Sequence, residues 1–246
     1  MNLFTDAFAW IFDGSHWTSG PSILLRTGET LQASVISVVI AAAIAIPVGI
    51  FIGHTGKGRG GAILIGNAAR ALPTLGLLSI LILLLGFGLL PITIVLVILG
   101  IPPLLAGVYS GIESVDRQTV DAARAIGMTE WQIITRVELP LAAPLIIGGL
   151  RAAVLQVIAT VSVASAFAFG GLGLYLFYGL AQGDYVQLLA GAILITALAL
   201  IVDGLLAVAQ RFVVPRGVAL GRTDPNGPQN RARTRRLRAL QEGMQS

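Results

Sequence analysis

The most informative segment of this chain is Asp121-Ala122-Ala123-Arg124-Ala125-Ile126-Gly127, followed after nine intervening residues by Val137-Glu138-Leu139-Pro140. This polar segment lies between two long apolar regions. Asp116 before it is a candidate N-cap, and Gly127 suits the left-handed position that follows a helix. The pattern predicts one short helix that ends at Gly127.

A second short helix is predicted directly after Gly127. Thr129 and Gln132 have the spacing of a capping box, in which each side chain accepts a hydrogen bond from a backbone N–H of the same turn. We expect Pro140 to end this helix, because proline has no N–H to donate. The segment 113–140 is therefore predicted to be a stiff helix–glycine–helix loop between two membrane spans.

The composition indicates an integral membrane protein. Of 246 residues, 55% are hydrophobic and 11% are charged, whereas soluble domains carry about 25% charged residues. The 30 glycines and 11 prolines lie among apolar runs, which is typical of membrane helices.

Charge-free stretches predict an all-α fold with about five membrane spans. Nothing between Glu29 and Lys57 is charged, and neither is anything from Ala71 to Ile112, a run about twice as long as one span of roughly 20 residues needs. The chain can fold back at Gly86-Phe87-Gly88-Leu89-Leu90-Pro91. The predicted spans are 31–52, 62–85, 91–109, 141–168 and 187–212, within a membrane domain at 28–214.

The basic residues predict the orientation of the spans. If the N-terminal segment 1–27 faces outward, nearly all of the 16 Lys and Arg residues fall on the cytoplasmic side, including those of the loop at 113–140. The opposite orientation would violate the positive-inside rule. No basic residue precedes Arg26, so a cleavable signal peptide is not expected.

The central loop resembles the EAA signature of permease subunits in bacterial ABC importers. That signature reads Glu-Ala-Ala, three residues, Gly, nine residues and Ile-x-Leu-Pro; here Asp121 replaces Glu and Val137 replaces Ile. The resemblance implies a type I importer fold in the bacterial cytoplasmic membrane. It also implies that the loop transmits force from an ATPase subunit, through Asp121, Ala122, Ala123, Gly127, Glu130, Leu139 and Pro140. A plain amphipathic loop on the membrane surface is the alternative.

Three further segments are similar to osmoprotectant permeases, which import glycine betaine, choline or carnitine. They are Asn67-Ala68-Ala69-Arg70-Ala71-Leu72-Pro73-Thr74-Leu75, Tyr109-Ser110-Gly111-Ile112 and Gly170-Gly171-Leu172-Gly173. The resemblance implies four partners: ABC ATPase subunits, a second permease chain, an extracytoplasmic binding protein and the lipid bilayer. An importer for an amino acid or another small polar solute is the alternative.

Aromatic residues cluster near the outer end of the fourth predicted span, and Phe167, Phe169, Tyr175 and Tyr178 are candidates for a substrate entrance. Aromatic faces attract quaternary ammonium groups. An interfacial aromatic belt explains the same residues.

Two charged residues are predicted to lie within the spans at similar depth, Arg151 in the fourth and Asp203 in the fifth. A charge inside the membrane is expected to face protein and find a partner. We expect a buried ion pair; lining of the translocation path, together with Pro102, is the alternative.

Other functions find little support in the sequence. A membrane enzyme would need convergent polar residues within the spans, and a one-chain secondary transporter usually needs inverted repeats. Cysteine is absent and His16 and His54 stand apart in the sequence, so no metal site is expected. The segment Gly53-His54-Thr55-Gly56-Lys57-Gly58 lacks the spacing of a phosphate-binding loop. ATP and magnesium are therefore expected on a partner ATPase, with no cofactor and no catalytic residue on this chain.

The segment 215–246 is expected to be a basic cytoplasmic tail. Five arginines lie between Arg231 and Arg238. They can fix the topology of the chain as a solvated tail, or bind anionic lipid in a salt-dependent way. Nucleic-acid binding is not expected so close to a membrane.

Overall fold

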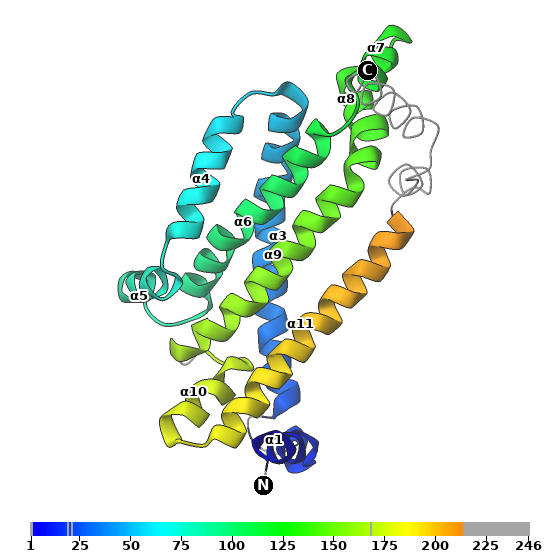
Figure 1. The fold of residues 1–246 in the computed structure, drawn as a ribbon. Helices are drawn as coiled ribbons and strands as arrows, with labels where there is room; N and C mark the ends of the chain where they lie inside the picture. The colour runs from blue at the N-terminus through cyan, green and yellow to red at the C-terminus, as the bar shows by residue number, and fades with distance from the viewer. Residues whose placement is uncertain (1, 19, 21, 168, 214–246) are drawn as a thin grey trace, which may run out of the picture.

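The structure is a computed structural model, and it describes residues 2–18, 20, 22–167 and 169–213. Every regular element in this part of the chain is a helix (Figure 1). The predicted tail at 215–246 lies outside the described residues. The principal helices are α1 (Leu3–Phe12), α2 (Ser15–Thr18), α3 (Ile23–Thr55), α4 (Arg59–Ala71), α5 (Thr74–Leu85), α6 (Leu89–Glu113), α7 (Arg117–Ala125), α8 (Glu130–Ile133), α9 (Leu139–Ala164), α10 (Gly173–Gln182) and α11 (Tyr185–Val213).

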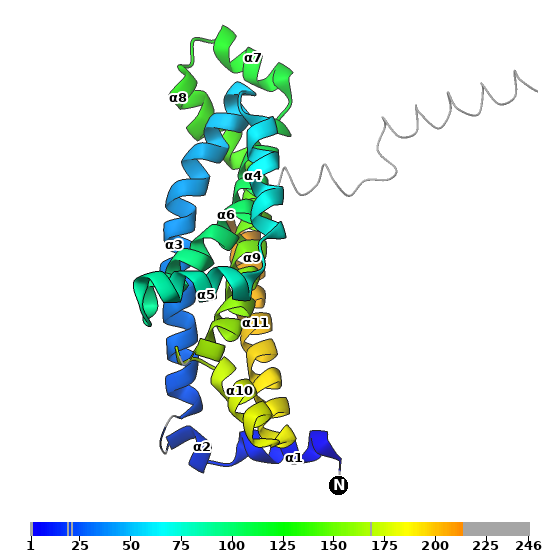
Figure 2. The same cartoon turned by 90° about the vertical axis from the view of Figure 1, so that its left-hand side faces the viewer.

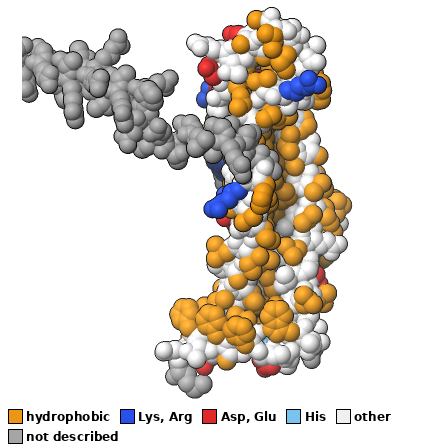
Figure 3. All heavy atoms as spheres, turned by 90° about the vertical axis from the view of Figure 1, so that its right-hand side faces the viewer, with side chains coloured by type: hydrophobic (Ala, Val, Ile, Leu, Met, Phe, Trp, Pro, Cys, Tyr) orange, Lys and Arg blue, Asp and Glu red, His pale blue; other side chains and the backbone are white. Residues whose placement is uncertain are grey.

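Four described helices are long and apolar enough to cross a membrane, and the bent pair α4–α5 makes a fifth candidate span. The first predicted span, 31–52, lies inside α3, which begins at Ile23, so the predicted boundary at 27/28 falls within this helix. Figure 3 shows hydrophobic side chains distributed along the length of the bundle on the side that carries α11, as expected of a surface that meets lipid.

Helices α3, α6 and α9 form the centre of the bundle (Figure 1). Glycines permit close approach between them. A Cβ atom at Gly49 would lie 2.7 Å from Val108 Cβ, and one at Gly53 would lie 2.6 Å from Ile112 Cβ. The Gly49-x-x-x-Gly53 pattern therefore seats α3 directly against α6.

The second predicted span, 62–85, is not one straight helix. It is divided into α4 and α5, which meet at an angle of 85°. Leu72 between them has extended backbone (φ −69°, ψ 129°) because the ring of the following Pro73 disfavours a helical residue before it. Figure 2 shows α5 lying across the bundle while α4 runs along it.

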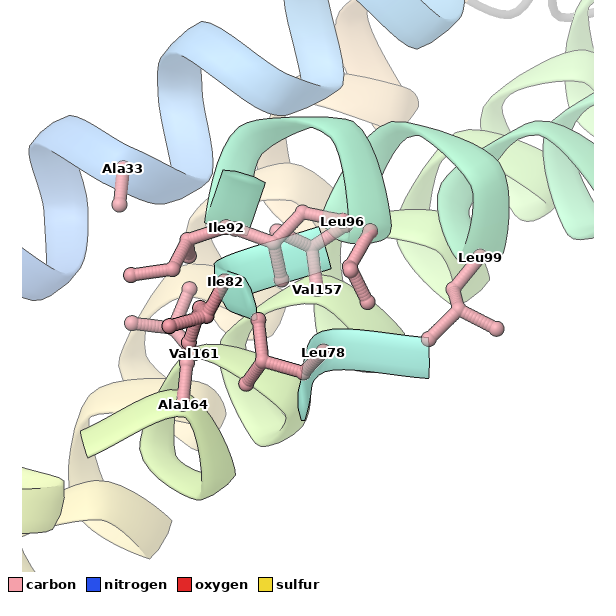
Figure 4. Close-up of a cluster of buried hydrophobic side chains, with 10 residues drawn as sticks. Ala33, Leu78, Ile82, Ile92, Leu96, Leu99, Val157, Val161 and Ala164 are labelled. Atoms are coloured by element: carbon pink, nitrogen blue, oxygen red, sulfur yellow. The ribbon is translucent and has the colours of Figure 1, made fainter. Parts of the chain in front are cut away.

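Apolar packing holds α5 in its crosswise position. Leu78 and Ile82 of α5 are buried in one cluster with residues of α3, α6 and α9 (Figure 4). The labelled partners are Ala33, Ile92, Leu96, Leu99, Val157, Val161 and Ala164. The bend is therefore part of the packed core.

Pro140 does not end the second short helix, contrary to the sequence prediction. The chain passes from α8 through one π-helical turn, Ile134–Glu138, directly into α9. A proline within a helix crowds the carbonyl four residues before it, here that of Arg136. The wider π turn accommodates this crowding and carries the helix onward, with the Leu139 N–H bonded to the Ile134 carbonyl.

Helices α1 and α10 form the end of the bundle opposite α7 and α8 (Figure 1). The turn before α10, which contains Gly170 and Gly171 at positive φ, is fixed to α3. The Gly171 N–H donates to a Glu29 carboxylate oxygen at 2.6 Å, and the Leu172 N–H donates to the Thr30 hydroxyl at 3.0 Å. The sequence did not predict α10 as a helix.

Candidate coupling loop and membrane cavity

Helix α7 is capped at both ends as the sequence predicts. The Asp116 side chain accepts a hydrogen bond from the Gln118 N–H at 3.0 Å. At the other end Gly127 has φ +86°, its N–H donates to the Arg124 carbonyl, and the Met128 N–H donates to the Ala123 carbonyl. These two bonds form a Schellman motif, which fixes the direction in which the chain leaves the helix.

Helix α8 begins with the predicted capping box. The Thr129 N–H donates to the Gln132 side chain at 2.9 Å, and the Gln132 N–H donates back to the Thr129 hydroxyl at 3.4 Å. Hydrogen-bonded caps therefore hold the backbone on both sides of Gly127.

One face of the loop packs against its own chain. Val120, Ala123 and Ile133 are buried in a cluster with Ile112 of α6 and Ala142 of α9. Ala123 was expected to let a partner approach, together with Ala122, but only Ala122 is exposed. Ala123 instead lets α7 lie close to the ends of α6 and α9.

The other face of the loop exposes two large apolar side chains. Ile126 is 80% exposed and Trp131 is 72% exposed, at the end of the bundle farthest from α1 (Figure 1). Asp121 and Glu130 are exposed beside them. Exposed apolar residues rimmed by charges are typical of a protein contact surface. Ile126 and Trp131 were not predicted as contact residues, because only the packing of α7 decides which apolar side chains of the loop stay exposed.

A charge network crosses from α7 to α8. The Arg124 guanidinium donates to both Glu130 carboxylate oxygens, at 2.8 and 3.0 Å, and to Asp121 at 3.1 Å. The bonds from Arg124 hold the pKa of the Glu130 carboxyl below its usual value of 4.5. The same bonds raise the pKa of Arg124. The network stiffens the angle between the two short helices.

His54 extends this network to the end of α3. Its Nδ1 lies 2.7 Å from the Glu138 carboxylate, and its Nε2 lies 3.1 Å from the Glu130 carboxylate. Glu138 is 1% exposed and belongs to the π turn that leads into α9. One imidazole therefore joins a membrane helix to the first residue of α8 and to the last residue of the π turn.

Leu139 and Pro140 lie behind the loop surface. Both are half-buried at the start of α9, and Leu139 packs against the cluster of Ile112, Val120 and Ile133. Their contribution is to join the loop to the membrane helix.

Arg151 and Asp203 meet in a bidentate ion pair between α9 and α11. Both N–H···O distances are 2.7 Å. Arg151 also donates to the Gln210 side chain at 3.2 Å, and Gln210 donates to the Pro144 carbonyl at 3.3 Å. The two charged side chains are 30% and 25% exposed, so the pair lies at a helix interface and is not sealed within the core.

A cavity of about 420 Å³ opens where α4 breaks into α5. A smaller cavity of about 80 Å³ lies next to it, and Arg70 and Pro102 line both. The residues around the larger cavity come from α4, α5, α6 and α9 and the α4–α5 break: Ala69, Arg70, Leu72, Thr74, Leu99, Pro102, Pro103, Ala152 and Gln156. Pro102 was predicted for the translocation path; Arg70 and Gln156 were not.

The four candidate entrance aromatics lie in three different surroundings. Phe167 and Phe169 pack against the cluster of Figure 4. Tyr175 is buried beside Trp10, with ring centroids 5.3 Å apart, and Tyr178 is 48% exposed. The described residues therefore do not form one aromatic cage from these four side chains.

Comparison with known proteins identifies a family over most of the chain. Residues 45–216 match the family described as "Binding-protein-dependent transport system inner membrane component". The glycine betaine/carnitine/choline transport system permease protein OpuCB of Bacillus subtilis is 38% identical over 82% of this chain and 93% of the relative. The choline transport system permease protein OpuBB of the same organism is 36% identical over the same shares.

Solved structures show the same fold. The methionine ABC transporter MetNI, in an inward-facing conformation, has a chain that aligns with a TM-score of 0.69 at 22% identity, over 78% of this chain and 97% of that one. An amino acid ABC transporter solved with histidines has a chain that aligns with a TM-score of 0.64 at 16% identity, over 86% of this chain and 98% of that one. At these identities the likeness concerns the fold alone.

Proposed function

The chain belongs to the family of binding-protein-dependent transport system inner membrane components, and from this premise we propose that it serves the uptake of a small osmoprotectant. As a member of this family it is an ABC importer permease. The relatives that it resembles over at least 92% of their own length are named for glycine betaine, carnitine and choline. That match over most of both chains is the observation that carries the proposal.

In this proposal ATP is hydrolysed by partner ATPase subunits, which hold the ATP and magnesium, and the loop at α7–α8 receives the resulting motion. The support is the exposed surface around Ile126 and Trp131, beside the charges of Asp121 and Glu130. The two capped helices and the His54 bridge make this surface stiff, so that displacement of the loop moves α3 and α9 together.

We place the coupling loop in the cytoplasm and the N-terminus outside. Lys57, Arg59, Arg117, Arg124 and Arg136 all lie at or near the end of the bundle that carries α7 and α8. The positive-inside rule assigns that end to the cytoplasm. The end formed by α1 and α10 then faces an extracytoplasmic binding protein.

A second permease chain, identical or homologous, completes the pathway in this proposal. Helix α11 leaves large apolar side chains such as Leu200, Leu205 and Phe212 mostly exposed. The cavity beside the α4–α5 break is only partly enclosed. Lipid and a second chain together account for these uncovered surfaces.

The test is solute uptake by the assembled complex in liposomes. We expect ATP-dependent uptake of at least one of glycine betaine, carnitine and choline. A matched complex that carries Gly127→Val in this chain should assemble normally and show uptake reduced several-fold or more. Uptake of an amino acid, and of none of these three compounds, would favour the alternative importer for another small polar solute.

A further inference from the structure

Arg70 is the feature of the membrane region that the proposed function does not account for. Arg59 and Arg151 are each paired with a carboxylate, of Glu113 and Asp203 respectively. Arg70 has no ion pair or side-chain hydrogen bond with any described residue. It is exposed, and it lines both cavities beside the α4–α5 break.

The depth of Arg70 makes a partner necessary. At 1.5 Å per residue it lies about 16 Å along α4 from the first residue, Arg59. An arginine keeps its charge under all ordinary conditions. A charge at that depth is costly against lipid, so it faces a cavity, another protein group or a ligand.

The backbone next to Arg70 is also unusual for a membrane helix. Leu72 and Pro73 interrupt the helical hydrogen bonding, and the two halves diverge by 85°. Interrupted backbone within a membrane is tolerated where it lines a cavity or is covered by protein. The break, the cavity and the unpaired guanidinium therefore coincide at one place.

The size and lining of the cavity select a class of ligand. About 420 Å³ is ample for a small organic solute. Its polar side chains are one guanidinium, one amide at Gln156 and one hydroxyl at Thr74, and no described acidic or aromatic residue lines it. A guanidinium binds a carboxylate through two parallel hydrogen bonds, and it repels a cation.

We propose that this cavity is a passing site for the carboxylate of a zwitterionic solute, with Arg70 as the contact residue and Gln156 and Thr74 as polar neighbours. The inference rests on the proposed function. Glycine betaine and carnitine carry a carboxylate beside the quaternary ammonium group, whereas choline carries a hydroxyl and is a net cation. Arg70 thus favours the first two solutes over choline.

The experiment compares uptake of the three solutes by the whole complex in liposomes. Arg70→Gln should lower uptake of glycine betaine and carnitine by about tenfold or more, the effect of losing a charged hydrogen-bonded pair. Choline uptake should be unchanged or higher. Arg59→Gln is the matched control, since it removes an arginine from the exposed start of the same helix, and it should leave the ratio of carboxylated solute to choline unchanged.

Arg70→Lys keeps the charge and loses the two-pronged geometry, so an intermediate ratio is expected. If the Arg70→Gln complex fails to assemble, Arg70→Lys becomes the test of the site. A ratio of carboxylated solute to choline equal to that of the wild type would then overturn the proposal. Equal losses of all three solutes in Arg70→Gln would also overturn it and would indicate that Arg70 pairs with a group of the second permease chain.

Failure of the site and failure of the proposed function give different results. A wild-type complex that transports none of the three solutes contradicts the function. One that transports choline alone contradicts only the carboxylate site. If only carboxylated solutes are transported, ATP hydrolysis without solute replaces choline as the reference, and Arg70→Gln should lose uptake while keeping that hydrolysis. Parallel loss of both would overturn the site.

Discussion

At the scale of single residues, His54 connects α3 to the α7–α8 loop and to the start of α9. It was dismissed as an isolated histidine, yet its imidazole lies between two glutamates. Glu138 is 84 positions away in the sequence, and only the packing of α3 beside the loop brings the two residues together. Asp116, Gly127 and the Thr129–Gln132 box were predictable because each acts on its own helix end within a few residues.

Gly127 is expected to tolerate asparagine but not valine. Its φ of +86° is left-handed, and no atom would meet an added Cβ within 4 Å, so any penalty is conformational. A β-branched residue held there costs on the order of 1–3 kcal/mol, whereas asparagine adopts this region readily. Gly127→Val should reduce ATP-driven uptake several-fold or more at normal complex yield, and Gly127→Asn should stay near wild type. Equal uptake by both variants would show that the turn is not needed.

The Arg151–Asp203 pair is expected to show strong coupling. Removal of one partner leaves an unmatched charge in the membrane, while removal of both leaves none. Arg151→Leu and Asp203→Leu should each lower complex yield and uptake more than the double variant does. Yield is measured by purification and uptake in liposomes. Additive losses in the double variant would mean that the two side chains act independently in the assembled complex.

At the scale of helices, the number of long apolar segments was predictable, but their shapes were not. The length of the uncharged stretches gives the number of spans, because each span needs about 20 apolar residues. It does not reveal that Pro73 divides the second span, whereas Pro140 lies near the start of α9 and the helix continues around it. The two prolines have different effects because their surroundings differ. After Pro73 the chain can bend, since α5 then packs against apolar side chains of the core, whereas the π turn before Pro140 accommodates its ring within a continuous helix.

The contact between α6 and α9 gives a prediction with an adjacent control. A Cβ atom at Gly149 would lie 2.7 Å from the Cα atom of Gly107, and backbone cannot move aside easily. Nothing lies within 4 Å of a Cβ at Gly148, one residue earlier in α9. Gly149→Ala should lower the melting temperature of the purified complex. Gly148→Ala should leave it unchanged or raise it slightly, since alanine stabilises a helix by about 0.5–1 kcal/mol over glycine. A Gly149→Ala complex as stable as Gly148→Ala would contradict the close packing.

At the scale of the whole molecule, the sequence alone was enough to predict a membrane protein, the helical loop and the family. It did not predict where α1 and α10 lie, because their positions depend on contacts between residues that are distant in the sequence. Helix α10 is short, and its position depends on Glu29 and Thr30, more than 140 residues before it in the chain. The candidate aromatics were grouped by sequence proximity, but α10 turns Tyr175 toward Trp10 while Phe167 and Phe169 pack on the core.

The orientation of the whole bundle can be tested directly because the sequence contains no cysteine. Thr18 in α2 and Gln118 in α7 are both exposed, and these two helices lie at opposite ends of the structure (Figure 2). Thr18→Cys and Gln118→Cys each add one thiol without changing a charge, so the charge bias that sets the topology is preserved. In right-side-out membrane vesicles, a membrane-impermeant thiol reagent should label Thr18→Cys at once and Gln118→Cys only after detergent is added. Detergent-solubilised samples of both variants serve as the reference for full reactivity. The reverse pattern would place the α7–α8 loop outside the cell, out of reach of a cytoplasmic ATPase, and would remove the basis of the coupling proposal.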